Sequence, residues 1–395
     1  MPQAVILAGG RGTRLKPLTD STPKPMIEFN GKPFLEHLIS FLSEHGVNRI
    51  LLLLGYLPDK IIDHFGNGHR FNVNIEYSIS DEINDTGKRI KLAEASIEQN
   101  FLLMYCDNYV PLPLGVMLKK FINRGFDGQI TVYSNKDEYT RSNLSIDDDG
   151  VIVQYDKSRL SNGLQGVDIG FAFFKKSILK HLPDDNVNFE SIIYPLLVQK
   201  RQLSAYVTDH RYYSVGSFDR LDLTKAFFDR QPAIFLDRDG VLNKKAPKAE
   251  YISDWDQFKW LDGALEALKL LKIARYRIII ITNQAGIARG MVSESSLLKI
   301  HENMIRDAVE SGGGIDAVYY CPHGWDDDCD CRKPKPGLLY KAQRKFHLDL
   351  SKIFFIGDDV RDQKAAVAAG CKSILVSLQY SLLKAVKEKI LIQNS

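Results

Sequence analysis

The chain has 395 residues, of which 44% are hydrophobic and 26% charged, and its formal net charge is +3. This composition is typical of a soluble globular protein, and the length favours two domains over a single core. The near-balanced charge gives no indication of nucleic-acid binding, and no apolar run approaches the roughly 20 residues of a membrane span. The start lacks the features of a signal peptide, so we expect a cytoplasmic protein without nucleic-acid or membrane partners.

Short apolar runs alternate with amphipathic stretches in both halves, which is the pattern of parallel sheets covered by helices. In the first half we expect a helix over Phe34–His45 and strands at Ala4–Leu7, Arg49–Leu54, Val73–Tyr77 and Phe101–Tyr105. In the second half we expect helices over Ala264–Ala274 and Asp362–Ala369, and strands at Ala233–Leu236, Ile278–Thr282, Ala317–Cys321, Ile353–Ile356 and Ser373–Val376. Pro232 cannot extend a helix and precedes a new strand, so we place two α/β domains at residues 1–230 and 231–395.

The first expected strand runs into a glycine-rich loop, Ala8-Gly9-Gly10-Arg11-Gly12-Thr13-Arg14. Glycines let backbone N–H groups approach a polyphosphate closely, and the arginines add fixed positive charge. Further on, Pro23-Lys24-Pro25-Met26 is a rigid segment that presents one ammonium group. A glycine loop after a strand is weak evidence by itself, since dinucleotide-binding folds and structural turns share it.

The whole string is more specific. Leu7-Ala8-Gly9-Gly10-x-Gly12-Thr13-Arg14-Leu15-x-Pro17-Leu18-Thr19, followed by Pro23-Lys24-Pro25-Met26, resembles the sugar-phosphate nucleotidyltransferases, and the resemblance runs to about Lys225. It implies a Rossmann-like, GT-A-like domain in which a sugar 1-phosphate attacks the α-phosphorus of a nucleoside triphosphate and pyrophosphate leaves. No covalent intermediate is needed, so positioning and charge neutralisation would supply the catalysis.

The resemblance also assigns roles to residues. Arg14 and Lys24 would neutralise phosphates, while the nucleotide would be cradled by Ala8, Gly9, Gly10, Gly12 and Thr13. Asp107, at the end of an expected strand, would bind Mg²⁺. Lys157 and Glu190 would contact the sugar and its phosphate.

Three positions depart from that family. Cys106 stands where glycine is usual, and Ser214 stands where a second metal-binding aspartate is usual. A neutral hydroxyl is a poor magnesium ligand, so this half either holds the metal by Asp107 alone or is slow or inactive. The segment Asp85-Thr86-Gly87-Lys88-Arg89-Ile90 is similar to that of glucose 1-phosphate cytidylyltransferases, which leaves the nucleotide base open.

The second half opens with a pair of aspartates, Asp237 and Asp239, directly after an expected buried strand. Such a pair can hold a hard cation while one member attacks and the other exchanges a proton, although the five letters alone also suit a surface turn. Partners follow at later strand ends. They are Thr282, Asn283 and Gln284, which could bind a phosphoryl group, the cations Arg332 and Lys333, and the carboxylates Asp358 and Asp359.

This order of motifs resembles the haloacid dehalogenase superfamily. The resemblance implies that Asp237 forms an aspartyl phosphate and that Asp239 is the general acid and base. Asp237, Asp358 and a backbone carbonyl near Asp239 would bind Mg²⁺, and Lys333 would balance the phosphoryl charge. Little sequence separates the first two motifs, so we expect a Rossmannoid domain with little or no cap.

Between the second and third motifs, Cys321, His323, Cys329 and Cys331 lie in one short loop. Three thiols and one imidazole suit a tetrahedral, structural Zn²⁺ with no open position. A disulfide would leave the histidine unexplained and fits poorly with a reducing cytoplasm.

The motifs around this loop resemble D-glycero-D-manno-heptose 1,7-bisphosphate phosphatases, with histidinol-phosphate phosphatases as near relatives. Arg289 could then reach a remote phosphate on the substrate. The product would be a heptose 1-phosphate, which a heptose 1-phosphate guanylyltransferase-like first half would activate with GTP, yielding GDP-D-glycero-α-D-manno-heptose. CTP in place of GTP, and a non-catalytic sugar-nucleotide-binding first half, remain alternatives. We expect small molecules as binding partners, and the sequence leaves open whether the chain forms a homo-oligomer.

Overall fold

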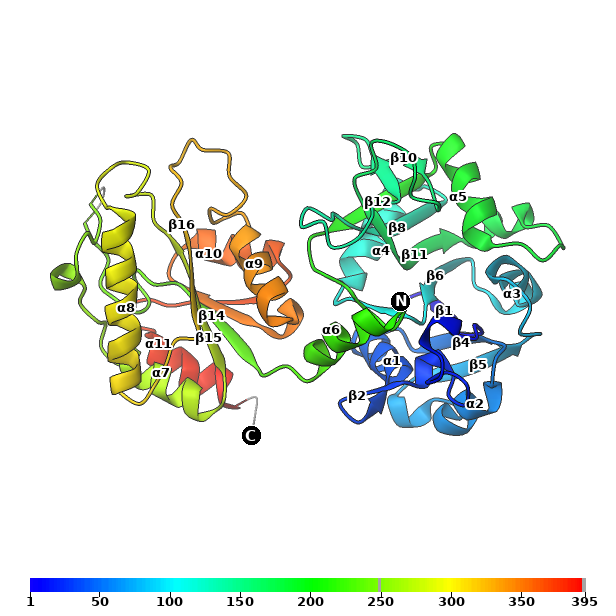
Figure 1. Cartoon of the computed structure of the whole chain (residues 1–395), viewed down its shortest axis with the longest axis horizontal. Helices are drawn as coiled ribbons and strands as arrows, with labels where there is room; N and C mark the ends of the chain where they lie inside the picture. Colours follow the sequence, from blue (N-terminus) through cyan, green and yellow to red (C-terminus); the bar gives the residue numbers. More distant parts are fainter. Residues whose placement is uncertain (248–249, 393–395) are drawn as a thin grey trace. The chain divides into compact units, whose positions relative to one another are not determined.

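The computed structural model describes residues 1–247 and 250–392, and the chain divides into two compact units, Met1–Asp229 and Arg230–Ser395 (Figure 1). This division lies one residue before the domain boundary expected from Pro232. Each unit has its own sheet and its own hydrophobic cores. Within the described residues, no helix has the length and apolar character needed to cross a bilayer.

The first unit is built on a seven-stranded sheet in the order β12-β8-β11-β6-β1-β4-β5. Its strands are β1 (Gln3–Leu7), β4 (Arg49–Leu54), β5 (Asn74–Ile79), β6 (Asn100–Tyr105), β8 (Gly128–Tyr133), β11 (Val167–Lys175) and β12 (Leu203–Thr208). β11 runs antiparallel to both of its neighbours, so the expectation of a wholly parallel sheet is wrong here. Between β8 and β11 the chain forms only the hairpin of β9 (Leu144–Ile146) and β10 (Ile152–Tyr155), whereas parallel pairing needs a crossover.

Helices cover both faces of this sheet and bury its continuous apolar strands. The helices are α1 (Phe34–Glu44), α2 (Pro58–Phe65), α3 (Thr86–Leu92), α4 (Leu114–Arg124), α5 (Phe189–Gln199) and α6 (Phe218–Phe228). One core contains Ile6 and side chains of α1 and α4, and the other contains Val5 and side chains of α3 and α5. Successive residues of β1 therefore point to opposite cores, as the twofold side-chain alternation of a strand requires. Two short antiparallel pairs complete the unit, β2 (Glu28–Phe29) with β3 (Lys32–Pro33) and β7 (Asn108–Tyr109) with β13 (Tyr213–Ser214).

The second unit is a five-stranded parallel sheet in the order β16-β15-β14-β17-β18. The strands are β14 (Ala233–Leu236), β15 (Arg277–Asn283), β16 (Ala317–Cys321), β17 (Phe354–Gly357) and β18 (Lys372–Leu375). Figure 1 shows helices on both sides of it. One core includes α7 (Ala264–Ile273), α8 (Glu294–Glu310) and α11 (Leu382–Ala385), and the other includes α9 (Gly337–Phe346) and α10 (Val360–Ala368).

The expected two-domain α/β fold class is confirmed. Between β14 and β15 the described residues form only α7 and one short 3-10 turn, Trp255–Gln257, which agrees with little or no cap. The strands β4, β14 and β16 have the expected bounds, and the bounds of the other expected elements shift by one or two residues. α10 starts two residues earlier than expected, at Val360, because Asp359 caps it, and Asp362 closes a capping box with the Asp359 backbone.

The stability of the second unit depends on burial along β15. Ile279 is fully buried, and we expect Ile279→Ala to destabilise this unit by about 2–5 kcal/mol through lost burial and an unfilled cavity. Ile273, 67% exposed at the end of α7, provides a matched control, and Ile273→Ala should change stability by less than about 0.5 kcal/mol. All tryptophans of the chain, Trp255, Trp260 and Trp325, lie in this unit, so urea unfolding followed by tryptophan fluorescence reports it selectively. Equal midpoints for the two variants would contradict the prediction.

Candidate active sites and metal centre

The polar motifs of the second unit meet at one edge of its sheet. Asp237 follows β14, Asp358 follows the neighbouring β17, and Thr282 and Asn283 close β15 on the other side. Because these strands are parallel, their carboxyl ends lie together. In α/β sheets this is the edge at which ligands bind.

Three carboxylates gather there around the ammonium of Lys333. Oxygens of Asp237, Asp358 and Asp362 all lie within 4.8 Å of one another. Lys333 Nζ lies 2.8 Å from Asp237 Oδ1 and 2.7 Å from Asp362 Oδ1, and it also donates to the carbonyl of Ile281 at 2.8 Å. Burial disfavours the charged ammonium, but these two carboxylates outweigh it and raise the pKa of Lys333. Lys333 is therefore a fixed cation.

Asp362 is a site residue that the sequence reasoning used only as a helix residue. Its side chain is 2% exposed and touches both Lys333 and the backbone N–H of Asp359. Gly357 makes room for it, since a Cβ there would lie 2.3 Å from Asp362. The available signal was the spacing of Asp359 and Asp362, three residues apart, which is that of a capping box at the start of a helix.

The three carboxylates Asp237, Asp358 and Asp362 are contacted by two ammonium groups in the described structure, those of Lys333 and Lys245. Burial raises the pKa of Asp237 to about 6; Lys333 opposes that rise, while Asp362 and Asp239 add to it. Lys245 Nζ lies 2.5 Å from Asp358 Oδ2. Oxygen ligands of this kind are those that a hard divalent cation takes, so the donor set fits Mg²⁺.

Asp239 faces the same space but accepts a different set of hydrogen bonds. Arg238 donates to both of its oxygens, Asn243 Nδ2 donates at 3.0 Å and Gln284 Nε2 donates at 2.9 Å. Burial alone would raise its pKa, but these donors, Arg238 foremost, hold the pKa of Asp239 below its usual range.

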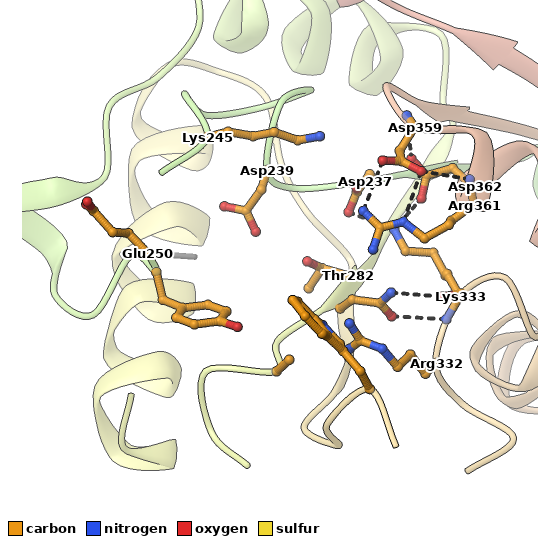
Figure 2. Close-up of a pocket in the computed structure, with 14 residues that line it drawn as sticks. Asp237, Asp239, Lys245, Glu250, Thr282, Arg332, Lys333, Asp359, Arg361 and Asp362 are labelled. Carbon is orange, nitrogen blue, oxygen red and sulfur yellow. Dashed lines mark hydrogen bonds and ion pairs between the residues drawn. The ribbon is translucent and has the colours of Figure 1, made fainter. Parts of the chain in front are cut away.

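The cavity between these groups has a volume of about 200 Å³. Figure 2 shows the side chains around it, including those of Asp237, Asp239, Thr282, Arg332 and Lys333. Asn283 also lines it, and its amide accepts from the Lys333 N–H at 3.0 Å and donates to the Lys333 carbonyl at 3.1 Å.

Gln284, expected at the transferring phosphoryl group, and Arg289, expected at a remote phosphate of the substrate, have other partners. Gln284 is buried outside the cavity lining, and its amide donates to Asp239 and to Thr282 Oγ1, so it orients these groups. Arg289 also lies outside the lining, with its guanidinium 4.1 Å from the centre of the Trp325 ring. Trp325 itself lines the cavity, so Arg289 reaches the site only through that ring.

The four expected zinc ligands converge. Cys321 Sγ lies 3.7 Å from Cys329 Sγ, 3.2 Å from Cys331 Sγ and 3.6 Å from His323 Nδ1. Ligands about 2.3 Å from one ion at tetrahedral corners lie roughly 3.8 Å apart, so the group fits one Zn²⁺. Arg332 donates to the His323 carbonyl at 3.2 Å and also lines the cavity, which ties this loop to the site.

In the first unit, the glycine loop lines a second cavity of about 210 Å³, together with Lys24, Arg89 and Asp107. Gly9, Gly10 and Gly12 are part of the lining. A Cβ at Gly9 would lie 2.5 Å from the Arg89 guanidinium, which is why glycine is needed there. Arg89, which the sequence reasoning did not single out, is 4% exposed and donates to the Leu54 carbonyl and Ser80 Oγ.

The other residues of the glycine loop do not line this cavity. Ala8 is buried and gives its N–H to the carbonyl of Leu53, so that N–H is not offered to a nucleotide. Thr13 and Arg14 begin a 3-10 turn and are exposed.

Asp107 forms the polar centre of this second cavity. Lys24 Nζ lies 2.6 Å from Asp107 Oδ2. Burial would raise the pKa of Asp107, but Lys24 and then Arg14 outweigh burial and lower it. Burial raises the pKa of the neighbouring Cys106 to about 12, so its thiol stays protonated at neutral pH.

The segment of Ser214 lies beside Asp107. Ser214 pairs with Asn108, and the N–H of Val215 donates to the Asp107 carbonyl at 2.9 Å. Ser214 therefore occupies the place next to Asp107 but brings a hydroxyl instead of a carboxylate. Among the described residues of this unit, no three Asp, Glu, His or Cys side chains place ligand atoms within 4.8 Å of one another.

Lys157 and Glu190 are far apart in sequence but meet in the structure. Lys157 Nζ lies 2.9 Å from Glu190 Oε2, and Tyr155 donates to the same oxygen at 3.2 Å. Asp168 lies close by, and burial followed by Glu190 raises its pKa to about 7. The sequence reasoning did not identify Asp168.

Comparisons with known proteins agree with the two halves. The nucleotidyl transferase family model matches residues 3–226, and a HAD-hydrolase-like model matches residues 330–379. The D-glycero-β-D-manno-heptose-1,7-bisphosphate 7-phosphatase of Pasteurella multocida is 42% identical over 150 residues, which are 36% of this chain and 80% of that protein.

Solved structures resemble the nucleotidyl transferase half. HddC from Yersinia pseudotuberculosis is 30% identical, covers 58% of this chain and 100% of its own, and has a TM-score of 0.50. A putative glucose-1-phosphate thymidylyltransferase from Bacillus anthracis, 18% identical, covers 57% of this chain and 94% of its own with a TM-score of 0.52, which supports the fold alone. The expected fusion is confirmed: the chain belongs to the nucleotidyl transferase family and also to the family of D-glycero-β-D-manno-heptose-1,7-bisphosphate 7-phosphatases.

Proposed function

We propose that this chain is a bifunctional enzyme of nucleotide-activated heptose synthesis. One half would remove the 7-phosphate from a D-glycero-D-manno-heptose 1,7-bisphosphate, and the other would transfer a nucleotidyl group to the resulting heptose 1-phosphate. The observation that carries the proposal is the presence of both family memberships in one chain, because the product of one reaction is the class of substrate that the other consumes. A histidinol-phosphate phosphatase would have no such relation to a sugar nucleotidyltransferase.

In the phosphatase half, Asp237 would attack the 7-phosphate, and the bond from phosphorus to the sugar oxygen would break. Asp239, which is ionised before the substrate binds, would take up a proton as the negative phosphate approaches and then give it to that oxygen, leaving an aspartyl phosphate on Asp237. Water would then attack this phosphoryl group, with Asp239 taking the proton, to release inorganic phosphate. Lys333, fixed between Asp237 and Asp362, would offset the charge of the phosphoryl oxygens.

Asp237, Asp358 and the backbone carbonyl of Asp239 would hold Mg²⁺, whose charge would offset repulsion between the attacking carboxylate and the phosphate. Asp362 is already paired with Lys333, so its role would be to fix that cation. Thr282 and Arg332, which both line the cavity, would contact the substrate. Cys321, His323, Cys329 and Cys331 would hold a structural Zn²⁺ that shapes the wall carrying Arg332.

In the nucleotidyltransferase half, an oxygen of the heptose 1-phosphate would attack the α-phosphorus and pyrophosphate would leave. Gly9, Gly10 and Gly12 would admit the nucleotide close to the backbone, and Lys24 would neutralise its phosphates. Arg14 lies outside the cavity lining, but its charge lowers the pKa of Asp107 and would assist in neutralising the phosphates. Asp107 would hold Mg²⁺ with the substrate phosphates and water, since Ser214 brings no charge. Lys157 and Glu190 would contact the sugar phosphate. GTP is favoured by the pairing of the two reactions, not by any one residue.

Asp237→Asn should abolish phosphate release from the heptose bisphosphate, because an amide cannot form the aspartyl phosphate. Nucleotidyl transfer to a heptose 1-phosphate should continue at the original rate. Inorganic phosphate and pyrophosphate are measured separately on the same preparation. Loss of both activities in a folded variant would contradict the assignment of the two reactions to separate units.

Pyrophosphate release with heptose 1-phosphate, each anomer tested with GTP, CTP, ATP and UTP, should be fastest with GTP. Turnover with CTP instead would establish the alternative favoured by the segment 85–90. If no triphosphate reacts while nucleotide binding is measurable, the first half is a binding module. Ser214 and Cys106, which stand where the nucleotidyltransferases usually have aspartate and glycine, would then explain the missing activity.

The purified chain should contain close to one zinc per molecule by elemental analysis, as one tetrahedral site requires. Cys329→Ser should lose this zinc and lower the thermal stability of the second unit, because a structural ion contributes folding energy. Cys371→Ser is the control, since Cys371 is buried away from the loop and should leave the zinc content unchanged. Full zinc retention in Cys329→Ser would show that these four residues do not bind the zinc.

A further inference from the structure

Arg238 stands between the two catalytic aspartates in sequence, yet its side chain points away from the substrate cavity. It is 1% exposed and is not among the residues that line the cavity. Its Nε donates to Asp239 Oδ2 at 3.1 Å and its Nη2 donates to Asp239 Oδ1 at 3.0 Å. These two bonds form the bidentate arrangement that fixes a carboxylate in both position and plane.

The far end of the same guanidinium contacts a histidine of α8. Arg238 Nη1 lies 3.2 Å from Nε2 of His301, which is 4% exposed. A guanidinium has only donors, so Nε2 must accept, which makes the imidazole neutral with its proton on Nδ1. Burial, and next the charge of Arg238, lower the pKa of His301 to about 3, so the ring stays an acceptor at neutral pH.

We infer that His301 is a positioning residue for the phosphatase reaction, acting through Arg238 on the carboxylate of Asp239. The inference rests on the proposed function, in which Asp239 is the proton donor. An arginine side chain has several rotatable bonds, so its fork fixes Asp239 only if the guanidinium is itself held. The 17-residue helix α8 supplies the rigid support for His301.

Asn243 and Gln284 also donate hydrogen bonds to Asp239, so the contribution of Arg238 has to be distinguished from theirs. Each donates one bond to one oxygen, at 3.0 and 2.9 Å. These two bonds come from separate side chains to separate oxygens, whereas the Arg238 fork holds both oxygens from one rigid plane. Loss of the acceptor on His301 should therefore loosen the orientation of Asp239 without removing it from the site.

A loosened proton donor has a recognisable kinetic effect. A sugar leaves as an alkoxide, which needs a proton in the transition state, whereas p-nitrophenolate leaves without one. Small misplacement of a catalytic group costs up to about 100-fold in rate, and general acid catalysis contributes about 10²–10⁴-fold. The loss should therefore fall on the sugar substrate, while a defect in packing or phosphate binding would affect both substrates alike.

The test compares His301→Leu, which removes the acceptor, with His301→Gln, whose amide oxygen can replace Nε2. The quantity measured is kcat/KM of the full chain with Mg²⁺, because it reports the first chemical step. For His301→Leu we expect a loss of about tenfold with the heptose bisphosphate and less than about twofold with p-nitrophenyl phosphate. His301→Gln should restore most of the difference. Met304→Leu, a buried change on the same helix, is the matched control and should leave the ratio of the two values unaltered.

Equal losses on the two substrates in a variant of unchanged melting temperature would overturn the inference, and so would no loss or no rescue by glutamine. If His301→Leu does not fold, Arg238→Lys tests the same link, since it keeps the buried charge but not the fork. It should show the same selective loss, and equal losses would again overturn the inference. Failure of the proposed function looks different, because the unchanged chain would then release no phosphate from the bisphosphate. In that case a simple alkyl phosphate replaces the heptose bisphosphate, and the variants are compared on it and on p-nitrophenyl phosphate.

Discussion

The phosphatase site depends on one buried ammonium. Asp237 and Asp362 carry like charges at the same sheet edge, and Lys333, 3% exposed, lies within 2.8 Å of both. A buried charge is tolerable only when it is paired and hydrogen-bonded, and removing one partner of such a set costs about 3–5 kcal/mol. Lys333 satisfies that condition, since the carbonyl of Ile281 takes its third N–H. Asp237, the helix that carries Asp362 and the segment that carries Lys333 are thereby held in one arrangement.

A second constraint follows from the sheet. Parallel strands bring their carboxyl ends to one edge, and the second unit uses four of five strands to supply its polar groups there. The neighbouring strands β14 and β17 supply the carboxylates, β15 supplies Thr282 and Asn283, and β16 ends at Cys321, one of the four residues that could hold a metal ion. In the first unit, β1 leads into the glycine loop and its neighbour β6 leads into Asp107, so the same rule builds both sites.

The sequence predicted those features that follow from periodicity and from local chemistry. Ala233–Leu236 is a continuous apolar run, and in Arg49–Leu54 every residue after the arginine is apolar; both form strands with the expected bounds. The zinc ligands lie in one loop, so their spacing alone predicted that they would meet. The antiparallel β11 was not predicted, because strand direction depends on how the chain returns to the sheet, which no local pattern encodes.

Some residues of the site were not predicted either, because their role also depends on the tertiary fold and not on a local pattern. Asp362 and His301 sit inside helices, where aspartate and histidine are usually surface residues, and only the tertiary fold brings them to Lys333 and Arg238. Gln284 was assigned to the phosphoryl group because of its place in the motif, but its amide is committed to Asp239. A motif identifies the chemistry that a segment can perform. The tertiary fold decides which of its side chains face the substrate and which hold the others.

The distinction between side chains that face the substrate and side chains that hold others explains how so many charges can gather around one small cavity. Arg238 and Lys333 are engaged by carboxylates on their buried sides, so they act as counterions that fix Asp239 and Asp237. Arg332 is bound only to a backbone carbonyl in the described structure, so its positive charge is not offset by a contacting carboxylate. Cations paired with carboxylates fix geometry before the substrate binds, whereas a cation without a contacting carboxylate is available at once to attract an anion. By this reasoning the loop that carries Cys321, His323, Cys329 and Cys331 would contribute to substrate binding through Arg332, which it holds at the cavity wall, more than through a bound ion.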